Sequence, residues 1–269
     1  MSLYRAIRWR RSIRDYPNKE LTEVQLDDLE NDLAETRKFN TEVSVDARLV
    51  RDGRALQEDI SGIIADYGKV EAPHYLVLTS EDTEDGYIEV GYRYEFVVLD
   101  LAAQGIGTCW IGKGFQDEQL NEYIELPSGQ TCVTLIALGP LSDEEELYEI
   151  ENPKRKAPGH FLIGRSPNSL AKETVEIIDC FRRAPSALNA QPWRVIGEEG
   201  TIHLYLRERN KITKIVLRNL NQLNRVDAGI GLCHLEVGGK YFQDGVEVGE
   251  TNHPEKKGLS YIGSLIGRD

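Results

Sequence analysis

The stretch APSALNAQPW, residues 184–193, lies in the last third of a chain of 269 residues. Two prolines, Pro185 and Pro192, enclose the small polar residues Ser186 and Asn189, and a tryptophan closes the stretch. Its natural companion is RWRRSIRDY, residues 8–16, close to the opposite end of the chain. The late position of the proline-rich motif is the unusual feature of this sequence.

Composition and charge are those of an ordinary globular chain. Hydrophobic residues make up 40% and charged residues 29%, and the net charge is −13. Nucleic-acid binding needs Lys and Arg to neutralise phosphates, so this charge argues against a nucleic-acid or anionic-membrane surface. No apolar run approaches the ~20 residues of a membrane span, and no apolar core of a secretory signal follows the N-terminal arginines. We therefore expect a cytoplasmic protein.

The residues that commonly bind metals show no metal-site spacing. The five histidines lack the HExxH pattern, and the cysteines form no CxxC pair. Cys233-His234 lies on an apolar helical stretch, where a core role is a better explanation than a catalytic nucleophile. The acidic run at 143–146 reads as a solvated loop. We expect no metal, and four reduced structural thiols: Cys109, Cys132, Cys180 and Cys233.

The hydrophobic pattern predicts helices at 22–36, 87–104, 171–183 and 226–240. It predicts strands at 74–80, 131–139, 202–208 and 259–267. Thr22 and Gln25 form a capping box for the first helix, and Gly105 ends the second. The order helix, strand, helix, strand occurs on both sides of a polar segment at 141–169. This repetition favours an internal duplication.

Four arginines gather in the N-terminal motif of this acidic chain: Arg8, Arg10, Arg11 and Arg14. A solvated helix face is the plain interpretation. On an extended segment, however, the alternation of Arg10, Ser12 and Arg14 would point all three side chains the same way. Two guanidiniums and a hydroxyl suit a terminal phosphate. A second basic segment, residues 154–156, could close over the same phosphate.

At this point the motifs indicate a family. RRSIRDY (10–16) resembles the opening motif of the nitroreductase family, which are FMN-dependent flavoproteins. APSALNAQPW resembles the second motif of that family, the GIGTCWIG turn (105–112) the third, and PKRKAP (153–158) its basic element. The resemblance implies an α+β nitroreductase fold in which helices flank mostly antiparallel central sheets.

The order of the motifs departs from that family. Its members are usually homodimers, in which the arginine motif of one subunit and the proline-serine motif of the other hold one flavin. Here AETRKFNTEVSV (34–45) stands where the first proline-serine motif should be, and GRSPNSLAKE (164–173) stands where a second arginine motif should be. The chain therefore resembles a dimer fused into two tandem halves, 1–160 and 161–269. Such a pseudo-dimer would be monomeric and would keep one of the two sites.

The resemblance implies roles for particular residues. The phosphate and ribityl end of FMN would be held by Arg10, Arg11, Ser12 and Arg14, completed by Lys154 and Lys156. The flavin would be lined from the other half by Pro185, Ser186, Ala187 and Asn189. Ile111, Gly112 and Lys113 would pass close to the isoalloxazine ring, and Arg14 would be the cation beside its reduced form. The motif around Gly112 is one residue longer than usual, so the N–H that faces N5 is not fixed.

The implied activity is that of an FMN-dependent NAD(P)H oxidoreductase. It would reduce nitroaromatic or quinone-like small molecules by ping-pong hydride transfer, and the reaction requires no side-chain acid or base. A flavin-binding or sensing protein without significant turnover is the alternative, and a scaffold that binds no flavin is a third possibility. The sequence identifies neither the physiological acceptor nor the choice between NADH and NADPH.

Overall fold

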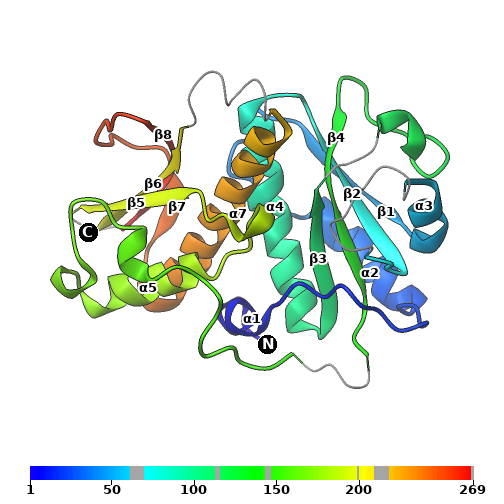
Figure 1. Ribbon diagram of the computed structural model, residues 1–269, viewed down its shortest axis with the longest axis horizontal. Coiled ribbons are helices and arrows are strands. Elements are labelled where there is room, and N and C mark those ends of the chain that lie inside the picture. The colour runs from blue at the N-terminus through cyan, green and yellow to red at the C-terminus, as the bar shows by residue number, and fades with distance from the viewer. Residues whose placement is uncertain (61–69, 113–115, 143–146, 199, 209–217, 268–269) are drawn as a thin grey trace. The chain divides into compact units, whose positions relative to one another are not determined.

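The protein is described here by a computed structural model that covers residues 1–60, 70–112, 116–142, 147–198, 200–208 and 218–267 (Figure 1). The chain forms two compact units. Unit 1 consists of Met1–Arg37, Thr41–Gly86 and Phe96–Glu149. Unit 2 consists of Lys38–Asn40, Tyr87–Glu95 and Ile150–Asp269. Unit 2 therefore combines the C-terminal part of the chain with two short segments of the first half, and unit 1 contains the rest of the first half.

Unit 1 is built on a four-stranded antiparallel sheet with the strand order β1-β2-β4-β3. Strand β2 is buried along its whole length, so its residues form the centre of the unit. The elements of this part of the chain are α1 (Leu3–Trp9), α2 (Glu23–Ala34), β1 (Val45–Val50), α3 (Gly53–Ile60), β2 (His74–Ser80), α4 (Glu84–Ala103), β3 (Ile106–Gly112), η1 (Asp117–Leu120) and β4 (Thr131–Pro140).

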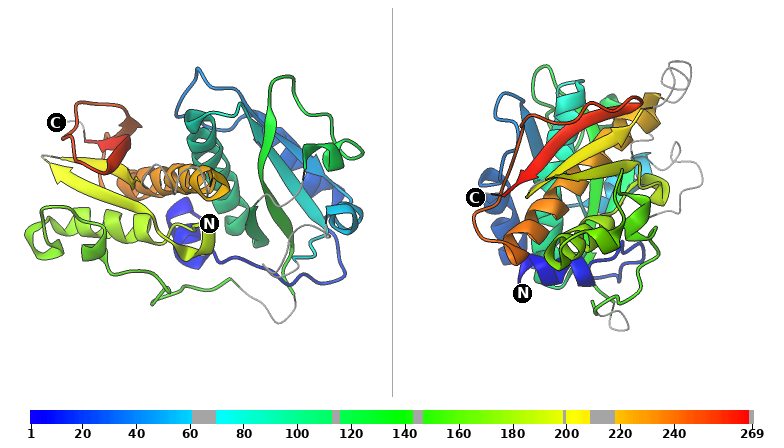
Figure 2. Two further views of the ribbon diagram at one scale, coloured as in Figure 1. Left: turned by 45° about the horizontal axis from the view of Figure 1, so that its top comes forward. Right: turned by 90° about the vertical axis from the view of Figure 1, so that its left-hand side faces the viewer.

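Unit 2 is built on a second four-stranded antiparallel sheet, with the order β5-β6-β8-β7. Helix α7 packs against α5 and along this sheet (Figure 2). Its elements are η2 (Pro158–His160), η3 (Pro167–Ser169), α5 (Lys172–Arg182), η4 (Ala187–Asn189), β5 (Trp193–Glu198), β6 (Thr201–Arg207), α7 (Arg218–Phe242), β7 (Glu247–Gly249) and β8 (Leu259–Ile266).

The two sheets repeat one topology. In each, the first two strands are neighbours, a long helix follows, and the fourth strand then pairs between the second and the third. The central strand pair of each sheet has one shift of register, at Leu78/Thr79 in unit 1 and at Leu204/Tyr205 in unit 2. The division of the chain into duplicated halves at residue 160 stays a prediction. A duplication would produce a repeated topology of this kind.

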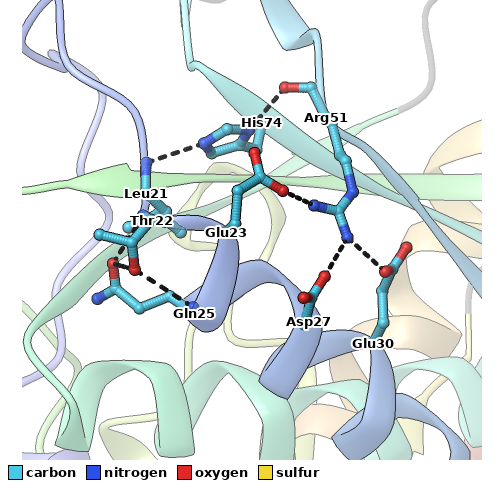
Figure 3. A network of polar contacts seen from close by, with 8 residues as sticks. All are labelled: Leu21, Thr22, Glu23, Gln25, Asp27, Glu30, Arg51 and His74. Atoms are coloured by element: carbon cyan, nitrogen blue, oxygen red, sulfur yellow. Dashed lines mark hydrogen bonds and ion pairs between the residues drawn. The ribbon is translucent and has the colours of Figure 1, made fainter.

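A polar network holds α2 against the first sheet (Figure 3). Thr22 and Gln25 form the predicted capping box at the start of the helix. The ring of His74 accepts a hydrogen bond from the Leu21 N–H at Nε2 (3.1 Å), and its Nδ1 donates to the Arg51 carbonyl (2.6 Å). Arg51 in turn pairs with the exposed carboxylates of α2: Glu23, Asp27 and Glu30. Because those pairs are exposed to solvent, the histidine contacts matter more for stability than the charges do.

The predicted elements are confirmed with small differences at their ends, except that α7 begins at Arg218, eight residues before the predicted start at 226. The α+β class is confirmed, and so are the helices α2, α4, α5 and α7 and the strands β2, β4, β6 and β8. Gly105 has φ +82°, as expected of a glycine that ends a helix. The interpretation of GIGTCWIG as a turn is wrong, because Ile106–Gly112 pairs with β4 along its whole length. The acidic run at 143–146 lies outside the described residues.

Candidate functional site

The N-terminal arginine motif in unit 1 is an extended segment that follows α1; we call residues 10–14 the clamp segment. The chain leaves the helix at Arg10, whose N–H donates to the Ala6 carbonyl (2.7 Å). Ser12 then pairs with Thr108 of β3 in parallel fashion, and the Ile13 N–H donates to the Thr108 carbonyl (2.9 Å). The clamp segment therefore lies beside β3 as a short added strand.

The alternation along the clamp segment separates its side chains. Arg10, Ser12 and Arg14 all act on the thiol of Cys109 in β3. Burial raises the pKa of Cys109, while the nearby guanidiniums of Arg14 and Arg10 and a hydrogen bond with Ser12 oppose that rise. The guanidinium of Arg11 instead lies over the ring of Tyr148, 4.7 Å from its centroid. Arg10 and Ser12 are thus close to the buried thiol, with Arg10 itself buried, while Arg14 is exposed; two guanidiniums and a hydroxyl are a donor set that suits a phosphate.

The other predicted residues of unit 1 lie further along β3. Ile111 packs against the core of the unit, and its carbonyl accepts a hydrogen bond from Thr134 Oγ1 (2.7 Å). Gly112 is exposed at the end of the strand, about 13 Å beyond Thr108 at the usual strand rise. Lys113 lies outside the described residues.

A hollow of about 350 Å³ opens beside the clamp segment within unit 1. It is lined by charged and polar side chains, namely Arg14, Asp15, Tyr16, Asn18, Arg54 and Glu71. The guanidinium of Arg54 is held by the Pro17 carbonyl (3.1 Å) and by Asn18. Of the clamp segment, Arg14 lines this hollow, together with the carboxylates of Asp15 and Glu71.

The proline-serine motif in unit 2 is a strained loop; we call residues 184–192 the wall loop. Leu188, Asn189 and Gln191 have φ values of 54°, 53° and 51°. Residues with a side chain rarely adopt this left-handed conformation, and such strain persists only where the surroundings impose it. Leu188 is largely exposed, so its conformation is not explained by burial of its side chain.

Hydrogen bonds from the basic segment 154–156 hold the wall loop in this conformation. The side chain of Gln191 accepts from the Lys156 N–H (2.9 Å) and donates to the Asn189 carbonyl (3.0 Å). Asn189 Nδ2 donates to the Lys154 carbonyl (3.0 Å), and Lys156 Nζ donates to the Ala190 carbonyl (2.8 Å). The structure therefore brings Lys154 and Lys156 together with the wall loop.

A buried carboxylate on α7 holds the backbone of the wall loop by a hydrogen bond. Asp227 Oδ1 accepts a hydrogen bond from the Ala187 N–H (2.9 Å), and the residue is 3% exposed. Among the described residues, no hydrogen-bond partner lies next to its buried Oδ2 atom. Burial raises the pKa of Asp227 to about 8, although the hydrogen bond from Ala187 opposes the rise. A perturbed group of this kind, next to a strained loop, is typical of a functional site.

Two residues that support the wall loop, Gln191 and Asp227, were not among the predicted site residues. Gln191 lies inside the motif APSALNAQPW, and its polar side chain was the signal that could have indicated a hydrogen-bonding role. Asp227 lies on α7, where an acidic residue within an apolar stretch of the helix was the available signal. Cys109 was expected to be structural, and it is buried as a free thiol. Trp193, expected to pack, is fully buried and lies 5.3 Å from Phe181 between ring centroids.

Two searches of the described residues give negative results. Within the ranges stated above, no group of three or more His, Cys, Asp or Glu side chains could hold a metal ion. None of the helices in that part of the chain combines the length and the apolar character needed to cross a membrane.

Comparison with known proteins gives a match over most of the sequence. A family model described as "Putative TM nitroreductase" matches residues 2–239. No curated protein matches the chain. A crystal structure from Thermotoga maritima MSB8, described as a "putative nitroreductase", is 23% identical, covers 99% of this chain and 94% of that chain, and has a TM-score of 0.64. It shows the same fold.

Two further structures match part of the chain. A nitroreductase with bound FMN from Bacteroides fragilis NCTC 9343 is 18% identical and has a TM-score of 0.47. The match covers 57% of this chain and 96% of that chain. An FMN-dependent nitroreductase from Clostridium difficile R20291 is 21% identical, with a TM-score of 0.44 and coverage of 54% and 90%.

Proposed function

Because the chain belongs to the TM nitroreductase family and is thus an oxidoreductase, we propose that it binds FMN and transfers electrons from NAD(P)H to nitroaromatic or quinone-like acceptors. The main support is the grouping of the motif residues. Arg10 and Arg14 both carry charge near the Cys109 thiol, with which Ser12 forms a hydrogen bond, and the basic segment is hydrogen-bonded to the wall loop. These groupings, each within its own unit, support the proposal.

The residues present fit FMN. The arginines at 10 and 14 and the Ser12 hydroxyl supply charge-assisted donors for a phosphate, each contributing about 1.5–3 kcal/mol. The wall loop supplies small side chains at Ser186 and Ala187, in a conformation that is fixed before any ligand arrives. A loop ordered in advance loses less entropy on binding.

The chain's own residues then bind and orient rather than react. When bound, FMN supplies hydride transfer between the donor and the acceptor, so that both substrates use one site in turn. The clamp segment holds the phosphate, and Arg14 provides positive charge towards the flavin. By the family resemblance, Pro185, Ser186, Ala187 and Asn189 would line the flavin, and Ile111, Gly112 and Lys113 would pass close to its ring. No residue is assigned as a general acid or base.

We further propose that the chain is a fused dimer with one FMN and no need of a second subunit. The repeated order of strands and the equivalent long helices α4 and α7 support a duplication. The motifs lost from one half are kept in the other, which supports one site rather than two.

The test is the absorption spectrum of the purified chain together with its turnover. We expect one FMN per chain, a monomer by light scattering, and NADH or NADPH oxidation that a quinone accelerates. The rate should show the parallel double-reciprocal lines of ping-pong kinetics. A chain that binds FMN but does not oxidise either nucleotide would favour the alternative of a flavin-binding or sensing protein. A chain that binds no FMN would contradict both.

A further inference from the structure

Four basic side chains line a cavity of about 470 Å³ in unit 2, which we call the basic pocket; they are Arg194, Arg207, Lys256 and Lys257. Ile163 and Leu259 supply its apolar lining. None of these residues belongs to the clamp segment or to the wall loop.

The sheet register places these side chains at one end of the second sheet. Arg194 is near the start of β5 and Arg207 is at the end of β6, which pairs antiparallel with β5. Arg207 is also opposite Leu259, the first residue of β8, and the Lys256 carbonyl accepts a hydrogen bond from the Leu259 N–H (3.1 Å). The cluster is therefore set by the strands and is not an accident of long side chains in solvent.

The positive charges of the basic pocket are close enough to affect one another. Burial lowers the pKa of Arg194, and the Arg207 charge lowers it further. Burial also lowers the pKa of Lys156, as do Arg194 and Arg207. The pKa of His160 falls for the same reasons, with Arg194, Lys156 and Arg207 as the charges. These like charges repel one another, and the repulsion is relieved when an anion binds.

Nothing in the described part of the chain neutralises this cluster. No ion pair joins a described carboxylate to any of the four basic lining residues. Arg194 donates to the Trp193 carbonyl (2.6 Å), and the nearby carboxylate of Glu208 accepts a hydrogen bond from Ser260 (2.8 Å). In a chain with a net charge of −13, four unneutralised cations around one cavity need an explanation.

We propose that the basic pocket is a second anion site, which binds the phosphate monoester of an organic ligand. Two guanidiniums can each grip a phosphate with two parallel hydrogen bonds, and lysines add charge without fixing orientation. The apolar side chains of Ile163 and Leu259 suit the organic body that carries the phosphate. This site is separate from the proposed flavin phosphate site, and its ligand binding does not depend on the proposed activity.

Two sources can supply this chemistry. One is the 2′-phosphate of NADPH. In its favour, Lys156 connects the basic pocket to the proposed flavin site within unit 2: its charge interacts with Arg194 and Arg207, and its Nζ donates to the Ala190 carbonyl of the wall loop (2.8 Å). The other is a free phosphorylated small molecule. Both require the same residues, and they differ in the rest of the ligand.

The experiment is calorimetric titration of the full chain, saturated with FMN if it binds FMN, with 2′,5′-ADP, 5′-AMP and glucose 6-phosphate. The test variant is Arg194→Gln with Arg207→Gln. The matched control is Arg165→Gln with Lys172→Gln, which removes the same charge from exposed positions of unit 2. We expect saturable binding that falls about tenfold to a hundredfold in the test variant and less than twofold in the control.

The three probes distinguish the sources. Preference for 2′,5′-ADP, with a fall in the kcat/KM ratio of NADPH to NADH in the test variant, identifies the 2′-phosphate. Equal binding of all three identifies a free phosphate ester. The proposal is overturned by an absence of saturable binding to the wild-type chain, by equal binding to the test variant, or by binding to the FMN-free chain that is lost in the FMN-saturated chain. Since binding is read as heat, failure here is distinguishable from a chain that lacks flavin or turnover.

Discussion

Gly91 of α4 and Gly229 of α7 each pack against the backbone carbonyl that lies three residues before the other. A Cβ on Gly91 would lie 2.0 Å from the Val226 oxygen, and a Cβ on Gly229 would lie 1.9 Å from the Ile88 oxygen. Both contacts are within unit 2. The two contacts are equivalent: each helix places a glycine against the carbonyl three residues before the glycine of the other helix. Such reciprocal contacts are typical of an interface with two-fold symmetry. It supports the proposal that the chain descends from a dimer.

The glycine crossing predicts two similar destabilisations. Gly91→Ala and Gly229→Ala each force a methyl group onto a carbonyl, so each should lower the free energy of unfolding by about 1–3 kcal/mol or more. Gly197→Ala is the control, because an added Cβ there would have Leu170 as its nearest neighbour, at 3.9 Å. Urea denaturation measures all three. A tolerated alanine at either helix position would show that the crossing is not this close.

The clamp segment predicts a loss of flavin without a loss of fold. Arg10→Ala combined with Arg14→Ala removes the two guanidiniums that share a side with Ser12. FMN binding should weaken by about 3–6 kcal/mol, or roughly two to four powers of ten. Because Arg10 is buried, the apoprotein of the double variant should melt somewhat earlier but still fold, and Arg14→Ala alone, at an exposed position, should leave the melt nearly unchanged. Fluorescence titration of FMN measures the affinity, with the exposed Arg48→Ala as control; unchanged affinity in the double variant would contradict the assignment.

Asp227 predicts a pH dependence of stability that a single substitution removes. Its folded pKa of about 8 lies above the unfolded value near 4, so the folded state binds the extra proton between these values. Its contribution to stability is therefore present at low pH and is lost as pH rises towards 8, by an amount of the order of a few kcal/mol. Asp227→Asn keeps an acceptor for the Ala187 N–H and cannot ionise.

The measurement for Asp227 is urea unfolding of both proteins at pH 5 and pH 8. The stability of Asp227→Asn relative to the wild type should increase between these two values. Asp227→Ala, which leaves the Ala187 N–H without its acceptor, should also weaken FMN binding. Parallel pH profiles for the wild type and Asp227→Asn would mean that the carboxyl is already ionised in the folded protein.

His74 predicts that stability changes with pH in the opposite direction, so that it falls as the pH is lowered. Its ring accepts from Leu21 and donates to Arg51, which requires the neutral form, and burial lowers its pKa from the usual 6.5. Stability from this residue is complete above about pH 6.5 and is lost as pH falls towards the lowered folded value. His74→Gln should flatten the profile there. His203, whose pKa burial also lowers, should leave a residual slope; a profile unaffected by His74→Gln would rule out this role.

The four cysteines are predicted to be dispensable for electron transfer. All are buried free thiols, and burial raises the pKa of Cys109, which disfavours the reactive thiolate. Replacement of each by Ala or Ser should cost some stability but keep turnover with NAD(P)H. The decisive result would be a single replacement that abolishes turnover while the melting temperature stays within the range of the other three.

The helices and central strands could be predicted because their signals are local. The capping box at Thr22 and the glycine at 105 mark helix ends directly in the sequence. Strand β3 could not be recognised in the same way, because glycines at 107 and 112 suggest a turn. It is a strand because β4 and the clamp segment pair with it on both sides, and pairing is a non-local property.

The motifs indicated the candidate site but not its support. Arg10, Ser12 and Arg14 follow from their alternation alone. The contact of Asp227 with Ala187 joins residues forty positions apart and depends on where α7 packs. The basic pocket is similar, since its arginines come from two strands and its lysines from a third segment. The spacing of residues along the sequence does not predict contacts of this kind, because they depend on strand register and helix packing.

The composition of unit 2 also determines when it can form during synthesis. It borrows Tyr87–Glu95 from the middle of α4, where Glu95 Oε1 lies 2.8 Å from Nε2 of His234 and both side chains are completely buried. Glu89 likewise accepts hydrogen bonds from the backbone N–H groups of Phe39 and Asn40. These acidic groups leave the ribosome more than a hundred residues before α7 does. A protease cut near residue 150 would therefore release no self-sufficient C-terminal fragment, and a gene split at that point would yield two pieces that need each other to fold.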